Sequence, residues 1–110
     1  MATISDQAKQ VAEKYVKHIR SKLDIDRAVL FGSVARGAAD KDSDIDLIII
    51  SNQFKKMNLA KRLTLLSHLR GREFLNWPMD ILGYTADEFD ELSKVSTMFA
   101  EAKSQGIVIR

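Results

Sequence analysis

The sequence contains no cysteine, a single proline, five glycines and no long apolar run. The absence of cysteine excludes disulfide bonds and thiolate metal ligands, and it is compatible with a reducing compartment. The longest strictly apolar run, residues 47–50, is far shorter than the about 20 residues that span a bilayer. Residues 1–7 lack the apolar segment of a secretory signal, so we expect a cytoplasmic protein without a membrane partner.

The 110 residues are 45% hydrophobic and 29% charged, with no low-complexity tract, repeat or linker-like change in composition. This size and composition predict one domain, residues 1–110, with its own core. The formal net charge is only +2, which is too mild to argue for a nucleic-acid partner.

Positive charge is nevertheless concentrated in one segment, because residues 47–72 contain no acidic side chain. Two interpretations are open: a solvated basic helix face, or a surface that meets an acidic partner or a polyphosphate. The basic residues of this segment are Lys55, Lys56, Lys61, Arg62, Arg70 and Arg72.

Apolar residues at three- and four-residue spacing predict a first helix over residues 4–23, opened by a capping box of Thr3 and Asp6. A second helix is expected over residues 58–72. Its predicted apolar stripe is Leu59, Leu63, Leu66 and Leu69, and Leu65 is expected on the outer face. A third helical segment begins at the capping box of Thr85 and Glu88 and is interrupted near Ser96.

Short runs rich in β-branched residues predict strands over residues 28–31, 44–50, 77–84 and 107–109. The run over residues 44–50 looks buried on both faces, as in the centre of a sheet. Alternation of helices and strands of this kind predicts an α/β (α+β) fold, in which helices flank a small mixed β-sheet.

Two aspartates, Asp44 and Asp46, stand two residues apart at the start of the best strand. Residues i and i+2 of a strand point to the same face, with Cα atoms roughly 6.5 Å apart. Carboxylates so placed can reach a shared cation, or two cations about 3.5–4 Å apart. Because like charges repel, a cation is their natural partner, and we interpret the pair as a metal site.

A glycine–serine pair, Gly32 and Ser33, follows the first predicted strand and opens a short helix that Gly37 ends. Glycine lets the backbone approach a ligand closely, and the helix start presents free N–H groups to an anion. Arg36 could clamp a phosphate, or it could pair with Asp40 or Asp42 in the following loop.

A third carboxylate is expected if a metal is also to activate a hydroxyl. Asp80, in the third predicted strand, is the first candidate, and Glu73 is the second. The acids of residues 87–91 fit the charge preference of a helix N-terminus better. His18 and His68 have no ligand spacing between them and are expected at the surface.

Together these residues resemble the signature of the DNA polymerase β-like nucleotidyltransferase superfamily, and within it the minimal nucleotidyltransferase (MNT) group. The resemblance rests on the segment Gly32-Ser33-Val34-Ala35-Arg36-Gly37, a ten-residue spacer, Ser43-Asp44-Ile45-Asp46-Leu47 and Asp80. Every signature position is filled, and the motifs lie within residues 25–84.

The resemblance implies the polymerase β-like nucleotidyltransferase fold and a set of residue roles. Asp44 and Asp46 would bind two Mg²⁺ ions, and Asp80 would complete the triad and help to activate the acceptor hydroxyl. Gly32 and Ser33 would hold the triphosphate, and Arg36 matches the arginine that is usual in this motif. The expected donor is ATP, with release of pyrophosphate.

Larger relatives of this kind carry a further helical domain that binds the acceptor, whereas 30 residues follow Asp80 here. We therefore expect the acceptor on another chain, such as the helical HEPN-type proteins that accompany minimal members as toxins. The expected activity is transfer of AMP to a hydroxyl of such a partner. The alternatives are an antitoxin that neutralises its partner by contact alone, and modification of a small molecule, as in antibiotic nucleotidyltransferases. A homo-oligomer is compatible with the sequence.

Overall fold

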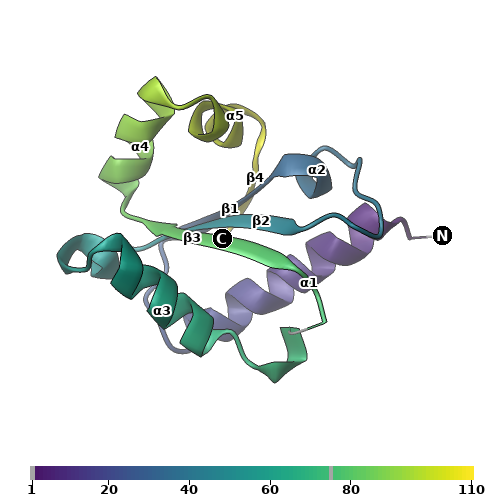
Figure 1. Cartoon of the computed structure of the whole chain (residues 1–110), viewed down its shortest axis with the longest axis horizontal. Coiled ribbons are helices and arrows are strands. Elements are labelled where there is room, and N and C mark those ends of the chain that lie inside the picture. The colour runs from purple at the N-terminus through teal and green to yellow at the C-terminus, as the bar shows by residue number, and fades with distance from the viewer. Residues whose placement is uncertain (1, 75) are drawn as a thin grey trace.

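A computed structural model describes residues 2–74 and 76–110, and its centre is a four-stranded mixed sheet. The strand order is β3-β2-β1-β4 (Figure 1); β2 and β3 are parallel, and β1 is antiparallel to both β2 and β4. The predicted small mixed sheet is therefore confirmed. The strands are β1 (Arg27–Phe31), β2 (Ile45–Ile50), β3 (Met79–Tyr84) and β4 (Ile107–Ile109).

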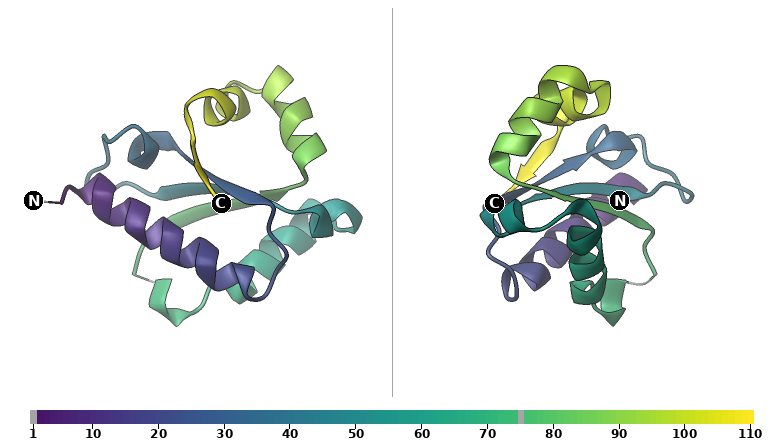
Figure 2. Two further views of the ribbon diagram at one scale, coloured as in Figure 1. Left: turned by 180° about the vertical axis from the view of Figure 1, so that it is seen from behind. Right: turned by 60° about the vertical axis from the view of Figure 1, so that its left-hand side comes forward.

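Helices cover both faces of this sheet, with α1 and α3 on one face and α4 and α5 on the other (Figures 1 and 2). The short helix α2 lies at the end of β1, on the side of α5 (Figure 1). Within the described ranges, no helix is both long and apolar enough to cross a membrane. The helices are α1 (Ile4–Arg20), α2 (Gly32–Ala35), α3 (Leu59–Leu69), α4 (Ala86–Val95) and α5 (Thr97–Gln105), with 3₁₀ turns η1 (Asn52–Lys56) and η2 (Arg72–Phe74).

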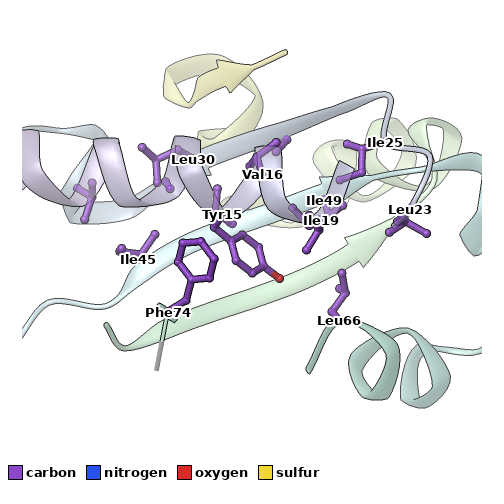
Figure 3. Close-up of a cluster of buried hydrophobic side chains, with 14 of the residues drawn as sticks. Tyr15, Val16, Ile19, Leu23, Ile25, Leu30, Ile45, Ile49, Leu66 and Phe74 are labelled. Carbon is purple, nitrogen blue, oxygen red and sulfur yellow. The ribbon is translucent and has the colours of Figure 1, made fainter. Parts of the chain in front are cut away.

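Strand β2 is buried on both faces, as its sequence predicted, and it belongs to two separate apolar clusters. Ile45, Leu47 and Ile49 pack with residues of α1 in the larger cluster (Figure 3). Ile48 and Ile50 join the smaller cluster below α4 and α5. Asp46 is thus the one residue of this central strand that is not apolar.

Several predicted helix boundaries are confirmed by hydrogen bonds. Thr3 and Asp6 form the capping box of α1, and Thr85 and Glu88 form that of α4. The predicted interruption is Ser96, which ends α4 and caps the start of α5. Each side chain satisfies backbone N–H groups that a helix start otherwise leaves unpaired.

Other boundaries differ by one to three residues from the predictions. Helix α1 ends at Arg20, because the chain turns at Ser21 and the N–H group of Leu23 donates to the carbonyl of Ile19 at 2.8 Å. Leu23 still reaches the core from this turn. Trp77 precedes β3 and lies outside it, and Asp44 stands one residue before β2.

The predicted apolar stripe of α3 is only half correct. Leu66 is buried and Leu69 packs on the core, but Leu59 and Leu63 are 53% and 48% exposed. Leu65, expected on the outer face, packs against the larger cluster. Helix α3 packs on β3, the edge strand of the described sheet, so the sheet does not extend beneath its whole apolar side.

The interpretation of residues 47–72 as a basic face is wrong for two of its arginines. Arg62 is only 4% exposed, and Arg70 donates to the carbonyls of Phe74 and Trp77. Both guanidinium groups bind backbone carbonyls instead of facing solvent, because Arg can satisfy several acceptors at once.

The two histidines also differ from each other. His18 is half-buried, with Nε2 2.8 Å from the carbonyl oxygen of Leu69, so its predicted surface position is wrong. His68 is exposed, as predicted.

Candidate active site

Asp46 and Asp80 lie side by side on neighbouring strands. The parallel register of β2 and β3 pairs them directly, so their side chains share the face of the sheet that carries α4 and α5. The backbone N–H of Ile45 donates to the carbonyl of Pro78 at 2.8 Å, which fixes this end of the pairing. Asp44 lies two residues before Asp46, at the entry of β2. The fold therefore brings the three predicted carboxylates to one end of the sheet.

Gly32 stands directly against Asp46. Phe31, the last residue of β1, is paired with Asp46, and the chain then turns through Gly32 with φ of +74°. A Cβ atom built on Gly32 would lie 2.3 Å from Oδ2 of Asp46, which is far inside contact distance. The residue must be glycine both because of its backbone conformation and because the carboxylate occupies the space beside it.

Helix α2 begins beside this carboxylate without a capping side chain. Its N-cap is Phe31, which makes no side-chain capping hydrogen bond in the described structure. The carbonyl groups of Gly32 and Ser33 accept from the N–H groups of Arg36 (3.2 Å) and Ala38 (2.9 Å). The N–H groups of a first helical turn have no carbonyl partner within the helix, and those of α2 are the groups for which the sequence predicted an anion. Ser33, in the same turn, is half-buried.

Burial and neighbouring negative charges both act on the carboxyl group of Asp46. Burial raises the pKa of its carboxyl above the ordinary value of 3.8, and the negative charges of Asp80 and Asp44 raise this pKa further. The positive charge of Arg36 acts in the opposite direction. The charges of Asp80, Asp44 and Arg36 therefore all act on Asp46.

Arg36 has a partner that the sequence did not indicate. Its Nη1 atom lies 3.3 Å from Oε1 of Glu101 on α5. Asp40, one of its two predicted partners, instead accepts hydrogen bonds from Asp42 and Ser43 within its own turn. The expectation of a loop pair with Asp40 or Asp42 is therefore wrong, and the 65 residues between Arg36 and Glu101 explain why no local signal revealed the true pair.

The carboxylates of Asp44, Asp46 and Asp80 offer the oxygen ligands that a hard divalent cation such as Mg²⁺ prefers. Gly32 adds no side chain beside Oδ2 of Asp46. No three His, Cys, Asp or Glu side chains of the described residues stand close enough together to hold a metal ion. The metal roles of Asp44, Asp46 and Asp80 stay predictions. The side chain of Glu73, the second candidate, lies outside the described part of the chain.

The raised pKa of Asp46 leads to a prediction for stability in a chelating buffer. An acid whose pKa is higher in the folded than in the unfolded state costs stability once the pH exceeds its unfolded value. We therefore expect Asp46→Asn to raise the melting temperature at pH 7.5, with a gain that shrinks as the pH falls toward and below 3.8. Thermal unfolding of both proteins across this range tests the expectation, and a variant that melts earlier at pH 7.5 would contradict it.

Comparison with known proteins gives a consistent picture. The sequence profile described as nucleotidyltransferase domain matches residues 12–103. A Methanocaldococcus jannaschii protein, named as a candidate protein adenylyltransferase, is 30% identical over 69 residues, which are 63% of this chain and 68% of that protein.

The fold also has a solved counterpart. The crystal structure of a candidate nucleotidyltransferase from Sulfolobus solfataricus superposes with a TM-score of 0.68, covering 98% of this chain and 87% of that one. At 18% identity, this similarity concerns the fold alone. The matched profile contains β1, α2, β2 and β3, and it spans all the predicted site residues from Gly32 to Asp80.

Proposed function

Since the chain belongs to the nucleotidyltransferase domain family, we propose that it transfers a nucleoside monophosphate, AMP from ATP, to a hydroxyl group of a partner protein. The observation that carries this proposal is the direct register pair of Asp46 and Asp80 beside the open backbone of Gly32. Two adjacent carboxylates beside a glycine turn that opens a helix provide groups that can hold metal ions and a polyphosphate, as nucleotidyl transfer requires.

In the proposed reaction, the acceptor hydroxyl oxygen attacks the α-phosphorus, the bond to the β-phosphate oxygen breaks, and pyrophosphate leaves. The backbone of Gly32 and the Ser33 hydroxyl would bind the polyphosphate at the start of α2. Arg36 would neutralise part of its charge. Asp80, at the exposed edge strand β3, would orient the acceptor hydroxyl and accept its proton.

Asp44, Asp46 and Asp80 are the residues proposed to hold Mg²⁺. The ions would supply charge neutralisation for the polyphosphate and lower the pKa of the attacking hydroxyl. Burial raises the pKa of Asp46, and repulsion from Asp80 and Asp44 raises it further. A cation would relieve this repulsion, which supports the role.

Two observations favour a protein as acceptor. The relative from M. jannaschii bears the name of a candidate protein adenylyltransferase. Asp80 also borders a hollow of about 280 Å³ that is lined in part by Leu63, and Leu63 is 48% exposed. Exposed apolar side chains beside a reactive group suit contact with another protein. A helical partner of the HEPN type, with this chain as its antitoxin, is the proposed pairing.

The experiment that tests this function uses the protein encoded by the neighbouring reading frame. We would incubate the two purified proteins with Mg²⁺ and each of the four labelled nucleoside triphosphates, and measure both complex formation and the mass of the partner. The expected result is a partner that gains the mass of one nucleotide, and no gain when EDTA is present during the incubation. Tight complex formation without any mass gain would favour neutralisation by contact.

A prediction for Gly32 follows from its contact with Asp46. Alanine at this position would place a Cβ atom 2.3 Å from the carboxylate and would also strain the backbone at φ of +74°. We expect Gly32→Ala to weaken binding of ATP with Mg²⁺ by about tenfold or more, equivalent to roughly 1.4 kcal/mol. Isothermal titration calorimetry of the folded variant measures this change.

Gly37→Ala is the matched control, because Gly37 has nearly the same φ of +73° but no atom within 4 Å of an added Cβ. Both variants carry the same backbone strain of about 1 kcal/mol, and only the first displaces Asp46. Equal nucleotide affinities of the two variants would show that contact with Asp46 plays no part in binding.

A further inference from the structure

Among the described side chains of α5, Glu101 is the one that pairs with Arg36. Arg36 is the residue after α2 and Glu101 lies on α5, 65 positions later in the sequence; both helices lie on the same side of the sheet (Figure 1). Their contact is a single N–O approach of 3.3 Å, and the side chains are 51% and 47% exposed. Such a half-exposed pair contributes little to stability, so a role in ligand binding is considered instead.

Arg36 is held by Glu101 within reach of the candidate site. The backbone N–H of Arg36 donates to the carbonyl of Gly32 at 3.2 Å, and Gly32 stands against Asp46, so Arg36 is one helical turn from the carboxylates while its side chain is bound to Glu101. Arg36 is also the C-cap residue of α2, whose first turn begins beside Asp46. A polyphosphate at that first turn would therefore meet a guanidinium group that already has an anionic partner.

We propose that Glu101 competes with the nucleotide for Arg36: it binds Arg36 in the free protein and releases it to the polyphosphate when nucleotide binds. This inference rests on the proposed function. A polyphosphate carries several negative charges and pairs of oxygens that match the guanidinium fork. It is a stronger partner than a single half-exposed carboxylate, and the exchange costs only the weak Arg36–Glu101 contact.

If Glu101 competes for Arg36, removing its charge should tighten binding. We expect Glu101→Gln to increase the affinity for ATP about two- to fivefold, the fold-change that corresponds to the energy of such a pair. Inorganic tripolyphosphate, which lacks the base and the sugar, should show the same gain. Isothermal titration calorimetry in the presence of Mg²⁺ measures both ligands.

A double-mutant cycle separates exchange of Arg36 from simple repulsion between Glu101 and the ligand. If the ligand takes Arg36 from Glu101, then Glu101→Gln has no effect on affinity in an Arg36→Gln background. If Glu101 simply repels the ligand, Glu101→Gln gives the same gain in affinity as in the parent protein. A merely structural role of the pair predicts the opposite sign, because losing a contact that supports the site would weaken binding instead of tightening it.

Asp90→Asn is the matched control. It breaks the pair of Asp90 with Lys103, which has the same N–O distance of 3.3 Å and side chains that are 51% and 53% exposed. This change removes one negative charge from α4, and it should alter neither affinity. The inference would be overturned if Glu101→Gln left the affinity for either ligand unchanged or lowered it. It would also be overturned if Glu101→Gln raised the affinity equally in the parent and in the Arg36→Gln background. A parent protein that binds neither ligand would instead overturn the proposed function.

Discussion

Asp80→Asn is expected to lower the rate of nucleotide transfer to the partner at least about 100-fold, because it removes the carboxylate proposed to orient the acceptor hydroxyl and accept its proton. Asp80 lies on the edge strand β3, in register with Asp46, so the change leaves the core untouched. Asparagine has nearly the same shape as aspartate. We therefore expect the variant to fold, to bind the partner and to retain ATP through the groups of α2 and β2.

Transfer and complex formation should be measured in the same samples, by the mass gain of the partner and by size-exclusion chromatography. Asp26→Asn is a suitable control, since the N–H of Asp26 donates to the carbonyl of Ile50 at the opposite end of β2, and its side chain is 60% exposed. Like Asp80→Asn, Asp26→Asn removes one negative charge, but it does so away from the site. Transfer by Asp80→Asn at the rate of the parent protein would remove Asp80 from the proposed mechanism.

The largest effect on stability is expected at Arg62. Its guanidinium and Nε groups donate to the carbonyls of Met57, Phe54 and Gly83 at 3.0, 2.7 and 3.2 Å. They also form a two-pronged contact with Glu88, at 2.7 and 3.0 Å. Replacing this side chain by methionine preserves apolar bulk but leaves three carbonyl groups and a carboxylate without their donor.

We expect Arg62→Met to lower the free energy of unfolding by about 3 kcal/mol, because buried acceptors without partners are costly. For a domain of this size, the melting temperature should fall by roughly 10 °C or more. Lys61→Met removes the same charge from an exposed neighbour on α3, and it should change stability by less than about 0.5 kcal/mol. Denaturant titration of both variants provides the comparison.

The contribution of Arg62 to the free energy of unfolding should also depend on pH. Hydrogen bonds from Arg62 lower the pKa of Glu88 below its ordinary value of 4.5. Because this pKa is lower in the folded than in the unfolded state, the contribution of Glu88 to stability is present at pH values above its unfolded-state pKa. The contribution is lost as the pH falls through its folded-state pKa. The stability difference between the parent protein and Arg62→Met should therefore narrow below pH 4.5. A constant difference down to pH 3 would show that Glu88 contributes nothing to it.

Local chemistry accounts for the features that the sequence predicted well. The capping boxes of Thr3 and Thr85 need only residues three positions apart, and the all-apolar pattern after Asp46 suffices to predict a central strand. The pair of Gly32 and Ser33, with Asp44 and Asp46 after a ten-residue spacer, likewise lies within one short segment. These patterns predicted the family, because the groups that would hold phosphate and metal are close in the chain as well as in the fold.

Contacts between distant segments could not be predicted in this way. The register that sets Asp80 beside Asp46 depends on how β3 docks on β2, across a crossover that includes α3. The burial of Arg62 depends on three carbonyl groups that the fold places around it. Leu59 is exposed because α3 lies at the edge of the sheet.

The sequence by itself therefore determined the order of the elements, their helix caps and the residues that carry the chemistry, since each depends on neighbours within a few positions. Only the tertiary structure decided which groups meet. It set the Gly32 backbone against Asp46, joined Arg36 to Glu101 and buried Arg62. The physical reason is that hydrogen bonds, charge and excluded volume act between atoms in space, and no spacing along the chain encodes which distant segments the packed core brings together.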